Sequence, residues 1–224
     1  MRTVVFDLDG TLADTSGDLI AAANVCFRDM GYGDVLSVEK DAGVALRGGR
    51  RMLTEGLSRL EVLDEATVTK YYPILLEAYG GAIATHTVIY DGAMEAVETL
   101  KSRGYGVGIC TNKPEALAGQ LLNALGVREA FGALVGADTL PVRKPDPLPL
   151  QETARRLNGD PAQTLLVGDS DTDRNTARAA GVPSVLVTFG PSGEDMAALE
   201  PEALLHDYAA LPQVVTALIG QNTN

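Results

Sequence analysis

The strongest constraint on the fold is a regular alternation of short apolar runs with helical patterns. The runs have the length and β-rich composition of buried strands, and they are Thr3–Phe6, Tyr105–Cys110, Ala133–Val135, Thr164–Val167 and Ser184–Thr188. Helical patterns lie between them, at Ala93–Arg103, Glu115–Leu125, Leu148–Leu157 and Asp173–Ala180. Alternating strands and helices are typical of α/β proteins. The sequence therefore predicts a doubly wound α/β domain with a mostly parallel sheet and right-handed crossovers.

The alternation is interrupted between Ser16 and His86, which gives the chain a second predicted unit. This segment is rich in helix formers at 18–30, 49–60 and 65–80, and it carries no clear strand pattern. We expect residues 1–15 and 87–224 to form the α/β core, and residues 16–86 to form a small helical domain inserted after the first strand. The alternative is that these helices simply pack on the faces of the sheet.

Composition and charge exclude several classes of protein. With 224 residues, 46% hydrophobic and 21% charged, the chain is ordinary for a soluble globular protein. It has no apolar stretch of the ~18 residues that a membrane span needs, and no leader pattern. We therefore expect a cytoplasmic protein that does not bind membranes, with Cys26 and Cys110 as buried free thiols. The net charge of −12, without any basic run, argues against nucleic acid as a partner.

Four short polar segments carry the chemistry. They are Asp7-Leu8-Asp9-Gly10-Thr11, Thr111-Asn112, Lys144-Pro145 and Gly168-Asp169-Ser170-Asp171-Thr172-Asp173. The first, second and fourth directly follow runs predicted to be buried strands. In an open parallel sheet, ligands bind at the carboxyl ends of the strands. Carboxylates, a hydroxyl and a lysine brought to that edge predict a metal-assisted phosphoryl-transfer site.

The electrostatics of such a cluster require cations. If Asp7, Asp9, Asp169 and Asp173 converge, each pair of charges at 4 Å costs roughly 4 kcal/mol at an effective dielectric constant near 20. Lys144 would supply one positive charge, and a bound divalent ion would supply the rest. The ligand atoms are all oxygens, and neither histidine of the chain lies near a motif. This donor set favours Mg²⁺ over zinc or copper.

The order D-x-D-G-T, T-N, K-P and G-D-S-x-x-D resembles the haloacid dehalogenase superfamily, most closely its phosphoglycolate phosphatases. The resemblance runs through Phe6–Gly31, Thr111–Gly126, Gly136–Leu150 and Leu166–Gly190. It is weakest over 37–86. It implies a Rossmann-like core, and it implies that the helical insert is a cap domain over the carboxyl edge of the sheet.

The resemblance also implies roles for the acidic residues. Asp7 would be the nucleophile that forms an aspartyl-phosphate and, with Asp169, a metal ligand. Asp9 would be the general acid and base, and would bind the metal through its backbone carbonyl. Thr11 would hold the loop so that Asp9 faces the leaving group. From its place at the start of the following helix, Asp173 is expected to orient Lys144 or metal-bound water without binding the metal itself, and Ser170 or Asp171 is expected to cap that helix.

The remaining candidates bind substrate. Thr111 and Lys144 are expected to contact the phosphoryl oxygens and to count among the catalytic residues, although Thr111 could also cap a helix. Asn112 would be a second contact to the phosphate or to the loop. In the insert, Arg47 is our candidate for binding a substrate carboxylate, because arginine can bind a carboxylate bidentately. The alternative is that Arg47, with its neighbouring arginines, is simply solvated.

These expectations converge on a Mg²⁺-dependent phosphomonoesterase that acts on a small anionic phosphorylated metabolite, with 2-phosphoglycolate as the first candidate. A phosphosugar mutase of the same superfamily is the alternative. A phospho-acceptor signalling domain would be about half as long and would have no insert. A dehalogenase would lack the aspartate at position 9. The sequence leaves open whether the protein is a monomer or a homodimer.

Overall fold

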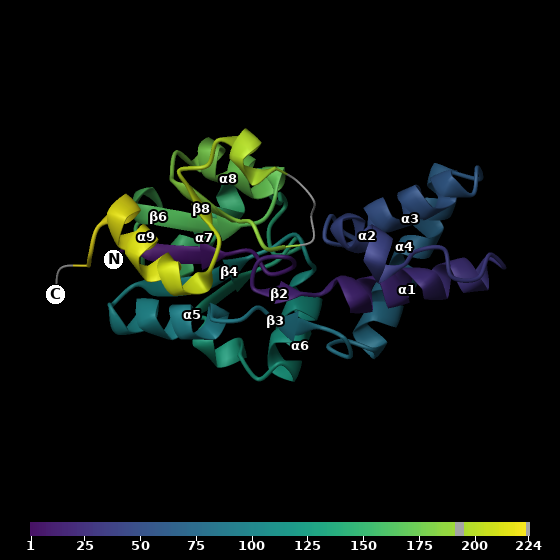
Figure 1. Cartoon of the computed structure of the whole chain (residues 1–224), viewed down its shortest axis with the longest axis horizontal. Coiled ribbons are helices and arrows are strands. Elements are labelled where there is room, and N and C mark those ends of the chain that lie inside the picture. Colours follow the sequence, from purple (N-terminus) through teal and green to yellow (C-terminus); the bar gives the residue numbers. More distant parts are fainter. Residues whose placement is uncertain (191–194, 223–224) are drawn as a thin grey trace. The chain divides into compact units, whose positions relative to one another are not determined.

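The computed structural model describes residues 1–190 and 195–222, and the chain folds into two compact units (Figure 1). One unit comprises Met1–Ala13 and Ile89–Asn224, and the other comprises Asp14–Val88. The expected boundaries, after residues 15 and 86, lie within two residues of these.

The first unit is built on a six-stranded sheet with the order β5-β4-β1-β6-β7-β8. The strands are β1 (Thr3–Phe6), β4 (Gly106–Cys110), β5 (Ala133–Val135), β6 (Thr164–Gly168), β7 (Ser184–Val187) and β8 (Ala203–Leu205). Every neighbouring pair is parallel. The chain winds outward from β1 through β4 to β5, then returns to the other side of β1 and continues from β6 to β8. This is the doubly wound topology, and the predicted fold class is confirmed.

Helices cover both faces of this sheet (Figure 1). They are α5 (Ala93–Ser102), α6 (Glu115–Ala124), α7 (Leu148–Arg156), α8 (Asp171–Ala180) and α9 (Leu211–Ile219). Single 3₁₀ turns lie at Arg128–Ala130, Pro161–Gln163, Met196–Leu199 and Tyr208–Ala210. Helices α7 and α8 pack against each other and the sheet, and α5 and α9 form a second packed pair. Because both faces are covered, β1 and β6 are buried along their whole length, which accounts for their uninterrupted apolar runs.

Strand β8 was not predicted from the sequence, because a tertiary ion pair fixes it rather than its own pattern. Of its three residues, Ala203 and Leu204 are only partly buried, and Leu205 alone is buried. Glu202, directly before the strand, accepts from Arg174 Nη1 of α8 at 2.9 and 3.0 Å, and from the Ser184 backbone N–H of β7 at 2.7 Å. These contacts join β8 to elements that are distant in the sequence.

The second unit is a bundle of four helices, α1 (Ser16–Asp29), α2 (Val38–Ala45), α3 (Gly49–Arg59) and α4 (Glu65–Gly81). The sequence predicted all of them except α2, which has only eight residues. Helix α1 packs against the other three, and α3 against α4. The Phe27 ring fills the space over Gly56, where an added Cβ would lie 2.2 Å from the ring. Glycine at 56 therefore lets α3 approach α1 closely.

The two ends of the helical unit are fastened together. The Asp18 carboxylate at the start of α1 accepts from the backbone N–H groups of His86 and Thr87, at 2.8 and 3.0 Å, and from the Thr87 hydroxyl at 2.7 Å. Where the chain passes between the units, β2 (Ala13–Asp14) and β3 (Val88–Ile89) form a separate two-stranded sheet.

Two expectations from composition can be compared with the structure. Cys26 and Cys110 are buried and free, as predicted. Among the described residues, no helix has the length and apolar character that crossing a membrane requires.

Candidate active site

Three central strands bring their loops to one edge of the sheet. Strand β1 pairs in register with both neighbours, so that Phe6 lies opposite Ile109 of β4 and Val167 of β6. Asp7 follows Phe6 directly, and the Asp7 N–H donates to the Val167 carbonyl at 2.9 Å. Because Phe6, Ile109 and Val167 lie in one row across the sheet, the residues that follow the three strands begin at the same edge. The loops after β1, β4 and β6 therefore meet at the point where the chain reverses its winding direction.

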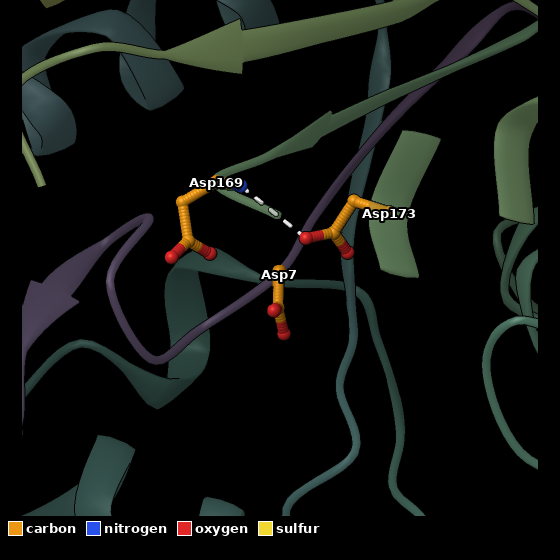
Figure 2. Close-up of side chains that lie close together, drawn as sticks. All are labelled: Asp7, Asp169 and Asp173. Carbon is orange, nitrogen blue, oxygen red and sulfur yellow. Dashed lines mark hydrogen bonds between the residues drawn. The ribbon is translucent and has the colours of Figure 1, made fainter. Parts of the chain in front are cut away.

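An acidic cluster occupies this edge. Figure 2 shows the side chains of Asp7, Asp169 and Asp173 lying close together at this edge. One oxygen from each lies within 4.8 Å of the others, which is close enough to surround one metal ion. Asp169 and Asp173 are buried, and the side chain of Asp7 is 14% exposed. The donors are all carboxylate oxygens, as Mg²⁺ prefers.

Lys144 joins two of these carboxylates. Its Nζ lies 3.1 Å from Asp7 Oδ1 and 2.7 Å from Asp173 Oδ1, and its side chain is 1% exposed. Burial alone would lower the pKa of Lys144, but the Asp173 and Asp7 carboxylates raise it above its usual value. The lysine is therefore a permanent cation in the cluster. The loop that carries it is fixed by Asn112, whose Nδ2 donates to the Lys144 carbonyl at 3.0 Å.

Asp173 already has three donors around its carboxylate. Oδ1 accepts from Lys144, and Oδ2 accepts from the Asp169 backbone N–H at 3.2 Å and from Ser170 Oγ at 2.6 Å. Ser170 also caps α8 by accepting from the Asp173 N–H, so its predicted cap is confirmed. A carboxylate with this many protein donors is suited to orienting Lys144, and Asp7 and Asp169 are better placed to bind an ion.

The electrostatics of Asp7 and Asp169 also fit the binding of a cation. Burial raises the pKa of Asp7 to about 6; Lys144 opposes the shift, and the Asp173 and Asp9 carboxylates add to it. Burial raises the pKa of Asp169 well above its usual range, with Asp173 and Asp7 adding to the shift. Both carboxyls thus resist ionisation when only protein surrounds them. A divalent ion would reverse that preference, so the residues present fit Mg²⁺.

Thr11 joins the first loop to the acidic cluster. Its hydroxyl donates to Asp169 Oδ1 at 3.0 Å, which connects the first loop to the cluster. Its carbonyl accepts from the Tyr208 hydroxyl at 2.6 Å, and its N–H donates to the Leu8 carbonyl at 3.4 Å. Thr11 therefore does fix the loop that carries Asp9. The carboxylate that its hydroxyl orients, however, is that of Asp169.

Asp9 pairs with a residue that our sequence reasoning missed. Asp9 Oδ1 lies 3.0 Å from Nζ of Lys113, and the two side chains are 14% and 4% exposed. Our motif ended at Asn112, one residue too early. The signal was present in the sequence, since Lys113-Pro114 repeats the Lys144-Pro145 dipeptide two residues after Thr111.

Two of the predicted phosphate contacts, Thr111 and Asn112, lie in the same loop as Lys113. Thr111 is buried, and its Oγ1 accepts from the Lys113 backbone N–H at 3.2 Å. A hydroxyl that accepts in this way still has its own proton to donate. The side-chain nitrogen of Asn112 contacts the Lys144 loop, which is one of the two roles expected for it.

Arg47 belongs to the helical unit. It is exposed, and it lies in the turn between α2 and α3, where its N–H donates to the Val44 carbonyl. The glycines after it have separate functions. Gly48 has φ +95°, and a Cβ at Gly49 would lie 2.9 Å from Leu75 of α4. The turn thus depends on a left-handed residue and on a close helix contact.

Arg50, by contrast, has a structural role in the helical unit. Its guanidinium contacts Glu65 and Thr69 at 3.0 and 3.1 Å and lies 5.4 Å from the Tyr72 ring centroid. These contacts connect α3 to α4, so Arg50 is a poor candidate for a substrate contact.

Comparison with known proteins identifies the family. A family model for haloacid dehalogenase-like hydrolases matches residues 1–181. The chain belongs to this hydrolase family. It is 38% identical over 212 residues to a phosphoglycolate phosphatase of Mesorhizobium japonicum, covering 93% of this chain and 92% of that protein. It is 37% identical over 214 residues to a phosphoglycolate phosphatase of Rhodospirillum rubrum, and the match covers 94% of this chain and 89% of that protein.

The fold of the family is also found among solved structures. A crystal structure from Haemophilus somnus, described as that of a predicted phosphoglycolate phosphatase, superposes with a TM-score of 0.84. The two chains are 26% identical, and the match covers 96% of this chain and 97% of the other. The likeness spans nearly the whole of both chains, so this family member shares the complete fold.

Gly168 is needed for the position of Asp173. An added Cβ at Gly168 would lie 2.3 Å from Cβ and Cγ of Asp173, so Gly168→Ala must displace the carboxylate. We expect the free energy of unfolding to fall by about 1–3 kcal/mol, as overpacked sites do. In the control, Gly119→Ala in α6, the nearest atom to the new Cβ is 3.8 Å away. That variant should gain roughly 0.5–1 kcal/mol. Denaturant unfolding measures both, and equal stabilities would contradict the packing argument.

The raised pKa values predict proton-linked metal binding. Because the pKa of Asp7 is raised to about 6, its carboxyl holds a proton below that pH, which an incoming ion must displace. Mg²⁺ affinity should therefore fall as the pH drops below 6, by about tenfold per pH unit for each proton displaced. Calorimetric titration in two buffers of different ionisation enthalpy measures the protons released. Asp7→Asn should reduce that release. An affinity that stays constant between about pH 5 and pH 7 would contradict the prediction.

Proposed function

We propose that this hydrolase is a Mg²⁺-dependent phosphomonoesterase that acts on a small anionic phosphorylated metabolite through an aspartyl-phosphate on Asp7. The first candidate substrate is 2-phosphoglycolate. The observation that carries the proposal is the convergence of Asp7, Asp169 and Lys144 at the carboxyl edge of the sheet. The two relatives described above, both named phosphoglycolate phosphatase, support the choice of substrate.

The first step is attack of the Asp7 carboxylate on phosphorus. A bond forms between Asp7 and phosphorus, and the bond from phosphorus to the leaving oxygen breaks. Lys144, 3.1 Å from Asp7 Oδ1, keeps positive charge beside the nucleophile. The Leu8 backbone N–H, which donates to the same oxygen at 2.7 Å, holds the carboxylate in place. Both contacts restrict the rotation of the side chain and pre-organise it for attack.

Asp9 would act as the general acid in the first step and as the general base in the second. It lies two residues after the nucleophile on the same loop, which Thr11 fixes. In the first step it would give its proton to the leaving oxygen. In the second step it would take a proton from the water that attacks the aspartyl-phosphate, so that Asp7 and inorganic phosphate are released.

Two other groups would hold the phosphoryl oxygens, namely the Thr111 hydroxyl and the Lys144 ammonium. The carboxylates of Asp7 and Asp169, with the Asp9 backbone carbonyl, would hold Mg²⁺. When bound, the ion neutralises the repulsion between the nucleophile and the phosphate. Asp173 would keep Lys144 aimed at the site, since it contacts that ammonium at 2.7 Å.

We assign the helical unit, residues 14–88, the role of a cap. A cap that closes over the site would exclude water during phosphoryl transfer and would admit only small leaving groups. Within it, Arg47 would contact the substrate carboxylate. Its exposure and its place in a turn support this role, whereas Arg50 is already committed to α4.

The test of the function is phosphate release from a panel of phosphorylated metabolites. We expect the wild-type enzyme to release inorganic phosphate from 2-phosphoglycolate with Mg²⁺, and to release none in excess chelator or with Ca²⁺ in place of Mg²⁺. Asp7→Asn should be inactive and should form no hydroxylamine-sensitive phosphoenzyme. Transfer of the phosphoryl group between sugar positions without phosphate release would identify a mutase. Asp7→Asn activity within about tenfold of wild type would refute the nucleophile.

Arg47→Ala tests the cap contact. Losing one charge-assisted contact to a carboxylate is worth about 1.5–3 kcal/mol. We therefore expect kcat/KM for 2-phosphoglycolate to fall roughly tenfold to a hundredfold. Hydrolysis of p-nitrophenyl phosphate, which has no carboxylate, should hardly change. Arg51→Ala is the matched control, because Arg51 is an exposed arginine of the same region. Equal losses on both substrates would show that Arg47 supports the fold or the chemistry instead.

A further inference from the structure

The active-site edge contains a second buried cation besides Lys144. Among the described residues, Lys113 and Lys144 are the buried lysines. Lys144 lies between two carboxylates of the metal cluster, whereas Lys113 pairs with Asp9, outside that cluster. The mechanism above gives Lys113 no role. A lysine is rarely buried unless it is paired or functional, and this one lies beside the group that handles the leaving oxygen.

The backbone of Lys113 is fixed by the core. Its N–H donates to Thr111 Oγ1 at 3.2 Å, and its carbonyl accepts from the Ala137 N–H at 2.9 Å. Pro114 follows as the N-cap residue of α6, and its ring restricts the backbone of Lys113 to extended conformations. The ammonium is thus presented from the end of β4, within the same unit as the nucleophile. Its position does not depend on the helical unit.

The chemistry of the leaving group places an anion near this ammonium. In 2-phosphoglycolate, three bonds separate the leaving oxygen from the carboxylate oxygens, a span of about 3–4 Å. Asp9 must approach that leaving oxygen to protonate it, and Lys113 Nζ lies 3.0 Å from Asp9 Oδ1. A cation held against Asp9 is therefore within reach of a carboxylate attached one carbon beyond the leaving oxygen. Without this cation, the substrate carboxylate would lie next to the negative charge of Asp9 with no ammonium between them.

We propose that Lys113 is a specificity-determining residue whose ammonium binds the carboxylate of the leaving group while it remains beside Asp9. This inference rests on the proposed function and deepens it. The α/β core itself would then recognise the second anionic group, and Arg47 of the helical unit would add to that recognition. The three N–H donors of an ammonium allow it to contact Asp9 and a substrate carboxylate together.

The experiment compares two substrates of matched shape. In isobutyl phosphate, a branched hydrocarbon replaces the carboxylate of 2-phosphoglycolate. Lys113→Met keeps an unbranched side chain one atom shorter than that of lysine and removes its charge. We expect it to lower kcat/KM for 2-phosphoglycolate about tenfold to a hundredfold more than for isobutyl phosphate, chiefly through KM. Lys113→Arg should keep most of the preference. The control is Lys101→Met, since Lys101 lies on α5 and pairs with Glu98, and it should change neither value.

Each other outcome would overturn the inference. Equal losses on both substrates would mean that Lys113 acts only through Asp9 or on the phosphoryl group. A wild-type preference for phosphoglycolate that survives in Lys113→Met would overturn this inference and leave the proposed function standing. A wild-type enzyme without that preference would overturn the proposed substrate, and this inference with it. If Lys113→Met fails to fold, Lys113→Gln supports the same comparison, because it is neutral but can still donate to Asp9.

Discussion

The in-register pairing of β1 between β4 and β6 is the constraint on which the site depends. Backbone hydrogen bonds hold three parallel strands level, so that Phe6, Ile109 and Val167 share one row. Asp7, Thr111 and Asp169 lie only one or two residues beyond that row, so their side chains start from the same edge of the sheet. A slip of one residue in either pairing would turn side chains to the opposite face of the sheet. The uninterrupted apolar runs and the covering helices maintain this register.

The charges at this edge show how a chain with a net charge of −12 can still hold positive charge at one place in its core. Two lysines are buried among the carboxylates. Lys113 follows the end of β4, and Lys144 lies in a loop that Asn112 fixes. Long-range repulsion from the acidic surface is screened within about a Debye length, whereas contacts inside the buried site are screened far less. The charge at this edge therefore depends on Lys144, Lys113 and the carboxylates around them, and the net charge of the chain has little influence on it.

The sequence predicted those parts of the fold that leave a periodic or compositional pattern. The buried strands Thr3–Phe6 and Ala133–Val135 were located to the residue, because a parallel sheet covered on both faces requires continuous apolar runs. Because these apolar runs mark where the strands end, they also located Asp7, Asp169 and Thr111, which directly follow strands. What the sequence could not predict depends on long-range pairing. The contact of Thr11 with Asp169 spans 158 positions, and β8 is fixed by Arg174 through Glu202. The pair of Asp9 and Lys113 is of the same kind, although the Lys113-Pro114 dipeptide offered a local signal.

The closure formed by Asp18 has a consequence for how this protein can change over evolutionary time. The helical unit leaves and re-enters the core through adjacent strands, β2 and β3, and Asp18 ties its two ends to each other. An insert whose ends meet places no demand on the parent domain beyond a short gap in one loop, which is the condition under which domain insertion is tolerated. The helices can therefore be exchanged, lengthened or remodelled while the catalytic machinery stays the same. One set of aspartates and lysines in the core can thus be combined with many different inserts. A change of substrate then requires changes in the insert and leaves the core residues as they are.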